Sequence, residues 1–223
     1  MRKRTCCLVL LAGFSAGFGC GGGLKYRIED SAMDNVPASE RQALSAARQD
    51  YEKAQGEKKL LERQRDPLDH DHDLCEKERQ QIQLDIDRAV AEQETAVKTR
   101  DETRSNAAER AKEIADVAMK TAEARLDWLG QKSDWLKAAL RAADARIDAA
   151  AAKVELEKAR VAKQKGIKTR EDQSVGSFES QWEDKTSDFQ SARDAAAEEE
   201  KKAKDLEQKW QNLRTQHGKL KGT

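Results

Sequence analysis

This 223-residue chain has few prolines and few aromatic residues, two and 4% respectively, and its net charge is zero. Only 36 of its residues are Leu, Ile, Val or Phe, too few for the layered core of a domain of this size. Disordered chains also have few large apolar residues, but they usually carry a high net charge or abundant proline, and this chain has neither. The composition therefore argues against a β-sandwich, a barrel or a doubly wound enzyme.

Ala, Glu, Lys, Arg and Leu are abundant and make up about half of the chain, which is typical of long helices and coiled coils. Basic and acidic residues are interleaved, so the chain lacks the basic stripe that nucleic-acid binding needs. It also lacks a nucleophile elbow, a phosphate-binding glycine loop and an H-E-x-x-H motif. We therefore predict an all-α protein of long antiparallel helical hairpins or coiled coil with three main helices, without catalysis, cofactor or nucleic-acid partner.

The first twenty residues have the pattern of a secretory signal. Three basic residues at positions 2–4 precede an apolar stretch at 6–18, which ends in small residues before Cys20. A bilayer span needs about 20 apolar residues, so this stretch is too short to cross a membrane. Its length suits a signal peptide.

The segment Gly17-Phe18-Gly19-Cys20 resembles a bacterial lipoprotein signal, in which cleavage before the cysteine leaves its thiol to carry acyl chains such as palmitate. Gly19 and Cys20 match the end of the lipobox, whereas Gly17 stands where Leu is usual and Phe18 is bulky. The alternatives are an uncleaved anchor or an ordinary signal peptide. The resemblance implies lipid attachment at Cys20 in the bacterial cell envelope, and Gly21 favours the outer membrane, facing the periplasm.

Residues 21–38 contain glycines and show no sustained period, which predicts a flexible tether. From Ser39 onward, apolar residues recur at the alternating spacing of three and four that marks a heptad. The predicted divisions are a signal peptide at 1–19, the tether at 20–38, a first helical hairpin at 39–103, an Ala-rich helical connector at 104–125 and a second hairpin at 126–220.

Pro67 is expected to end the first helix, because proline disfavours the helical conformation of the preceding residue and donates no helical hydrogen bond. Residues 67–73 then form a turn, and Asp73 with Glu76 forms an acidic capping box for the next helix.

The second helix is expected to run from Leu74 to about Lys165. In that arrangement an Ala stripe at residues 100–120 has no partner within the chain. Three alternatives remain open: a second copy covers the stripe, the helix breaks near Ser105 and Asn106, or the stripe is solvated.

Gly166 and Gly176 bracket the second predicted turn, after which a clean heptad runs over 178–220. Matching it to 126–161 places Trp210 opposite Ser133, so that large side chains face small ones. We interpret the aromatic residues on or beside these positions as an interaction seam, chiefly a core between helices: Trp128, Trp135, Trp182, Phe189 and Trp210.

One short segment concentrates metal-ligand residue types: Asp69, His70, Asp71 and His72. Such a run cannot easily close a tetrahedron, so these residues are weak metal candidates and a polar turn is the alternative. Cys75, the one cysteine of the body, is expected to be a shielded thiol or a cross-link between copies.

The predicted architecture is similar to that of helical-hairpin envelope lipoproteins. Two functional hypotheses follow. The first is a membrane-anchored spacer or assembly scaffold that contacts a protein partner or itself through its helices. The second is a periplasmic holdase chaperone or adaptor that grips clients with its hairpins. Client-gripping surfaces usually expose larger apolar or single-sign patches, so the interleaved charges favour the first.

Overall fold

The computed structural model describes residues 23–167 and 173–222; the predicted signal peptide and Cys20 lie outside the described residues. All regular structure within the described residues is helical. The all-α prediction is confirmed, with three main helices if the helices Gln42–Glu62 and Arg65–Thr99 are taken as one bent helix. The elements are η1 (Asp30–Met33), η2 (Ala38–Glu40), α1 (Gln42–Glu62), α2 (Arg65–Thr99), α3 (Glu102–Lys165) and α4 (Val175–Lys221).

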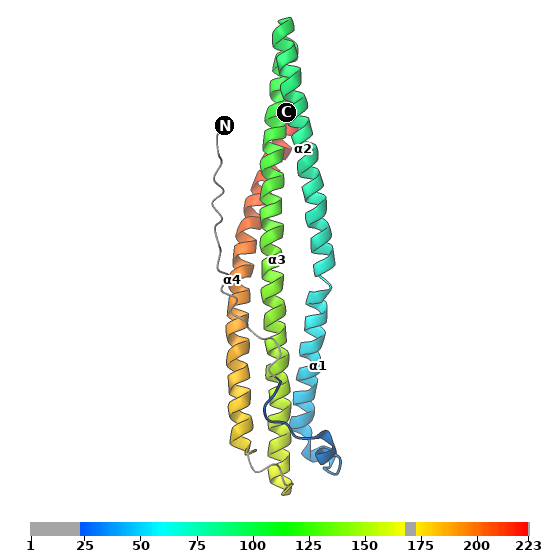
Figure 1. Ribbon diagram of the computed structural model, residues 1–223, viewed down its shortest axis with the longest axis vertical. Coiled ribbons are helices and arrows are strands. Elements are labelled where there is room, and N and C mark those ends of the chain that lie inside the picture. The colour runs from blue at the N-terminus through cyan, green and yellow to red at the C-terminus, as the bar shows by residue number, and fades with distance from the viewer. Residues whose placement is uncertain (1–22, 168–172, 223) are drawn as a thin grey trace, which may run out of the picture.

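The molecule is a rod with α3 along its middle (Figure 1). α1 and α2 follow one another along one side of α3, and α4 begins at the same end as α1 and packs along another side of α3. At 1.5 Å per residue the 64-residue α3 is about 96 Å long. We call the end where α1 begins, α3 ends and α4 begins the base. The tip is the opposite end, around the reversal between α2 and α3, where these two helices continue beyond α4 (Figure 1).

The predicted turn at residues 67–73 is wrong, because these residues are helical and belong to α2. Pro67 is the third residue of α2, within the first turn of the helix, where backbone N–H groups lack helical partners in any case. Its missing donor leaves the carbonyl of Arg63 without an i+4 bond. The chain therefore bends between α1 and α2 without reversing.

The chain reverses instead at Arg100, which has the left-handed conformation (φ 55°, ψ 35°). The N–H of Asp101 donates to the carbonyl of Ala96 at 2.9 Å, and the Asp101 carboxylate caps α3 by accepting from the N–H of Arg104 at 3.0 Å. The long helix thus breaks shortly before the Ser105–Asn106 position considered above. The Ala stripe after it packs on the second half of α2.

The second hairpin is formed by α3 and α4, and its predicted buried faces are confirmed. Every predicted heptad position from Phe178 to Leu220 is buried or half-buried, and so is every one from Leu126 to Val161. The predicted register was wrong. Trp210, expected opposite Ser133, stacks on Trp128, more than one helical turn nearer the start of α3.

The segment before α1 is not the flexible tether that its composition predicts. Ile28, Met33 and Val36 are 7%, 1% and 4% exposed and pack with Leu156 and Phe178 at the base. These three apolar residues are not spaced with a helical period, so the sequence gave no sign that they pack. They nevertheless cover the apolar residues of α1, α3 and α4 at the base. We call residues 24–36 the strap.

Candidate functional sites

Side chains of α3 and α4 hold the strap by its backbone at two residues. The Gln181 side-chain oxygen accepts from the N–H of Tyr26 at 2.9 Å, and its amide group donates to the Tyr26 carbonyl at 3.1 Å. Glu155 accepts from the N–H of Ile28 at 2.7 Å, and Lys158 donates to the Ile28 carbonyl at 3.0 Å. Both backbone groups of each residue are therefore paired, as they are in a β-ladder.

The charges that make these bonds are themselves buried and paired. Lys158 is 5% exposed and lies 2.8 Å from Glu155 and 2.9 Å from Asp30. Arg48 of α1 reaches the same Asp30 carboxylate at 2.8 Å. The hydrogen bond from Lys158 holds the pKa of Asp30 below its usual value, with smaller electrostatic contributions from Lys158 and Arg48. Buried charges need such pairing, so the strap has a defined position.

Apolar contacts add to the polar ones. The Tyr26 ring lies 5.8 Å from the Phe178 ring, tilted by 56°, while Met33 and Phe178 are 1% and 0% exposed. Sequence reasoning missed Glu155, Lys158 and Gln181, because their partner is a backbone segment more than 120 residues away. The only sequence signal was the presence of apolar residues in an otherwise polar segment.

The five aromatic residues of the predicted interaction seam are all half-buried and lie on α3 or α4. Trp135 packs beside the cluster of Leu68, Cys75, Leu129 and Leu136. Other contacts of these residues include a stack of Trp128 on Trp210, with ring centroids 4.9 Å apart, and the Lys153 ammonium 4.3 Å from the Trp182 ring centroid.

A groove runs between α2 and α4, with α3 as its floor and a volume of about 720 Å³. The floor is lined by small residues of α3, Ala115, Ala118 and Ala122, and the sides by Ile82 and Trp210. The two edges carry charges of opposite sign. The α2 edge has Glu78 and Asp85, and the α4 edge has Arg214 and Lys221, with the imidazole of His217 between them in sequence. Burial, followed by the nearby Lys221, lowers the pKa of His217.

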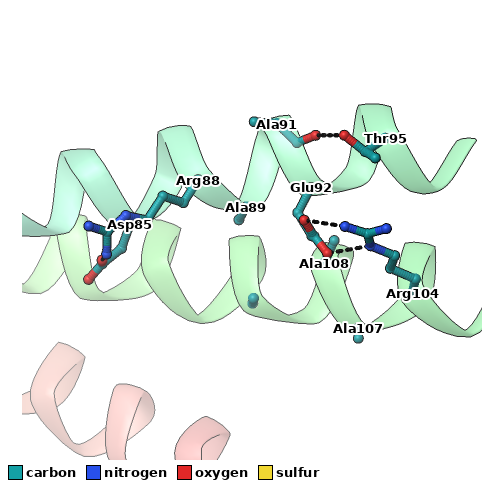
Figure 2. Close-up of a pocket in the computed structure, with 10 residues that line it drawn as sticks. Asp85, Arg88, Ala89, Ala91, Glu92, Thr95, Arg104, Ala107 and Ala108 are labelled. Carbon is teal, nitrogen blue, oxygen red and sulfur yellow. Dashed lines mark hydrogen bonds and ion pairs between the residues drawn. The ribbon is translucent and has the colours of Figure 1, made fainter. Parts of the chain in front are cut away.

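A second hollow, of about 690 Å³, lies beside the first at the tip (Figure 2). Ala89, Ala107 and Ala108 line it, and an ion pair between Glu92 and Arg104 joins α2 to α3 at its edge (Figure 2). Both hollows share Asp85 and Ala111. Together they form one continuous open face of the α2–α3 hairpin.

The weak metal candidates Asp69, His70, Asp71 and His72 follow the surface of α2, where the helical rotation spreads them apart. Within residues 23–167 and 173–222, no group of three or more His, Cys, Asp or Glu side chains is arranged to hold a metal ion. Asp69 and His72 line a small hollow against Gly130 of α3.

Cys75 is 0% exposed and its thiol donates to the Ala122 carbonyl at 3.6 Å. Burial raises the pKa of this thiol, which disfavours the reactive thiolate. Of the two alternatives for Cys75, the shielded thiol is therefore the one found.

No protein-family model, characterised protein or solved structure matches the chain. No helix among the described residues combines the length and the apolar character needed to cross a membrane.

Proposed function

We propose that the protein is a non-catalytic lipoprotein of the bacterial cell envelope. Acylated Cys20 anchors it to a membrane, with the outer membrane facing the periplasm as the favoured location. Its helices serve as a structural spacer or assembly scaffold that contacts a protein partner. The observation that carries this proposal is the docking of the strap at the base of the rod, close in sequence to the cysteine.

The distance along the chain supports this arrangement. Six residues lead from Cys20 to Tyr26 and span at most about 20 Å when fully extended. Because Tyr26 is bonded to Gln181, an anchor at Cys20 keeps the base of the rod near the membrane. The tip then projects away by up to about the 96 Å length of α3. A rigid rod fixed at one end suits a spacer better than a freely tethered body.

The hollows support a role in contacts with other proteins. They are open grooves lined by alanines and by charged side chains, many of them ion-paired, which suits a surface for protein contact.

Metabolic labelling tests the anchor. The full chain is produced in a bacterium that processes lipoproteins and is grown with an alkyne analogue of palmitate. We expect labelled protein in the membrane fraction, and loss of both label and membrane association in Cys20→Ser. Cys75→Ala is the matched control and should keep both. A Cys20→Ser protein that remains labelled, or a wild-type protein that is never labelled, overturns the proposed anchor.

The alternative, a holdase or adaptor, is favoured by one observation. α1 and α2 expose four large apolar side chains at 44–64%: Leu60, Leu74, Leu84 and Val97. An aggregation assay with a model client discriminates the two functions. Suppression of aggregation that is lost in a Leu84→Glu, Val97→Glu double variant supports the holdase, and no suppression supports the scaffold.

A further inference from the structure

The edges of the α2–α4 groove carry charges that do not meet. α2 and α4 both pack on α3, but within the described part of the chain no ion pair crosses the groove between them. Glu78 pairs with Arg125 of the α3 floor at 3.0 Å, and Asp85 pairs with Arg88 of its own helix at 3.5 Å. The Arg214 guanidinium lies 5.7 Å from the Trp210 ring centroid. Both carboxylates are paired only on their own side of the groove, and the Glu78 and Asp85 side chains are still 63% and 50% exposed, so a charged partner can reach them.

We propose that this groove is the docking surface for a second copy of the same chain, with the two rods side by side and parallel. A symmetric dimer uses the same patch on both copies. A two-fold axis along the rods lays α2 of each copy over α4 of the other. The acidic edge of one copy then meets the basic edge of the other.

The heights along the rod agree with this pairing. Glu78 pairs with Arg125, whose guanidinium also lies over the Trp210 ring, so Glu78 and Trp210 lie at one level. Asp85 and His217 are each seven residues further along their helices in the same direction, so Asp85 lies at a level between Arg214 and Lys221. A two-fold axis along the rod preserves that level, and each carboxylate meets a cation on both sides of the dimer. An axis across the rod places α2 over α2 and α4 over α4. Like charges then face each other, which disfavours the antiparallel arrangement.

The apolar part of the groove fits a close helical approach. Between the charged edges, the alanines of the floor and the side chains of Ile82 and Trp210 give the facing copy an apolar surface. The open face continues into the tip as far as Arg104. Along α3, from Arg104 to Arg125, the open face is about 30 Å long.

This inference rests in part on the proposed function and deepens it by naming the partner. Two copies anchored at their bases in one membrane stand parallel, which is the arrangement that the charges select. Dimerisation and anchoring are nevertheless separate properties, and one experiment can read them separately.

The experiment is disulfide trapping of the full chain in its host membrane, in a Cys75→Ala background. Asp85→Cys and Arg214→Cys are placed on two differently tagged copies and expressed together. We expect a mixed disulfide between the two tags, in clear excess over either same-tag dimer. A predominance of the Asp85→Cys same-tag dimer, or no cross-link in any combination, overturns the parallel dimer.

The Cys75→Ala chain without added cysteines separates failure of the anchor from failure of the dimer. If Cys20 is acylated, this chain has no free thiol in its mature part and gives no dimer. A dimer in this control reports an unmodified Cys20 and overturns the anchor, without bearing on the groove. In that case the trapping is repeated with Cys6, Cys7 and Cys20 all replaced by Ser in each chain.

Charge exchange provides a second measurement, by sedimentation of the full chain in detergent. Asp85→Arg or Arg214→Glu alone should weaken the dimer about fivefold or more, and the two changes together should restore most of the loss. Arg193→Glu on the exposed face of α4 is the matched control and should leave the dimer unchanged. Equal effects of all three single changes, or no recovery in the double variant, contradict the proposal.

Discussion

The indole rings of Trp210 in α4 and Trp128 in α3 lie face to face, with centroids 4.9 Å apart and planes inclined by 7°. The Arg125 guanidinium lies 5.8 Å from the Trp210 ring centroid. This stack marks the register of α4 along α3. It also places Trp210 at the edge of the groove.

Replacing Trp210 by Phe keeps an apolar ring but removes most of the stacked surface. We expect the free energy of unfolding to fall by about 0.5–1.5 kcal/mol, the range for a paired aromatic contact. The exciton signal of the two indoles in far-ultraviolet circular dichroism should disappear. Trp182→Phe is the control and should leave that signal in place, because Trp182 contacts Lys153 rather than another indole. An exciton signal that persists in Trp210→Phe contradicts the register.

Gln181→Ala removes both hydrogen bonds to Tyr26 and should loosen the strap without unfolding the rod. Two hydrogen bonds of about 0.5–1.5 kcal/mol each imply that the backbone N–H of Tyr26 exchanges roughly ten times faster or more. Hydrogen exchange with mass spectrometry measures this. Gln190→Ala, which removes an exposed bond to Asp194 on the same helix, is the control. The strap is not held as described if both variants exchange alike.

The pH dependence of the strap follows from Asp30. Its pKa in the folded protein lies below the ordinary value of 3.8, because Lys158 and Arg48 stabilise the carboxylate. Its contribution is therefore fully present only above the unfolded value of 3.8 and is lost as the pH falls through the lower folded value. We expect strap protection to be constant near neutral pH and to decline as the pH falls below 3.8. Asp30→Asn should lower protection at neutral pH and flatten this decline, whereas Asp34→Asn should leave the profile unchanged.

Replacing either of two glycines at α3 by Ala is expected to change the free energy of unfolding in opposite directions. A Cβ at Gly130 meets nothing within 4 Å, so Gly130→Ala should stabilise the protein by about 0.5–1 kcal/mol through helix propensity. Gly166 ends α3 at φ +64°, where an L side chain is strained, so Gly166→Ala should destabilise it by about 1–2 kcal/mol. Urea denaturation measures both. Equal shifts in the same direction contradict these helix assignments.

The heptads predicted which faces are buried, because the side-chain period of a helix is written directly in the sequence. The prediction of a turn at Pro67 was wrong because it followed the general effect of proline on helices and not the heptad pattern around this residue. Leu61, Leu68 and Cys75 are each one heptad apart, so the apolar phase passes through Pro67 unbroken. That continuity indicates a bent helix, since a turn resets the phase.

The true reversal at Arg100 had a weaker sequence signal. Left-handed residues at helix ends are usually Gly or Asn, and Arg100 is neither. Asp101 as an N-cap was the only local indication. The docking of the strap was even harder to predict from the sequence, because its position depends on Glu155, Lys158 and Gln181. A pattern based on neighbours three or four residues apart cannot report partners so distant in sequence.

The hydrogen bond between Tyr26 and Gln181 spans 155 residues of sequence and closes the chain into a loop. The contacts of α2 with α3 and of α3 with α4 form between helices that follow one another, and such contacts require closure of only short connections. The contacts of α1 with α3 are intermediate, since Glu57 and Arg146 are 89 residues apart. The entropy lost on closing a loop grows with its length, so the strap is expected to be the last part to fold. If the chain is anchored at Cys20, the rod forms while its membrane attachment is still loose. The attachment becomes rigid only when folding is complete.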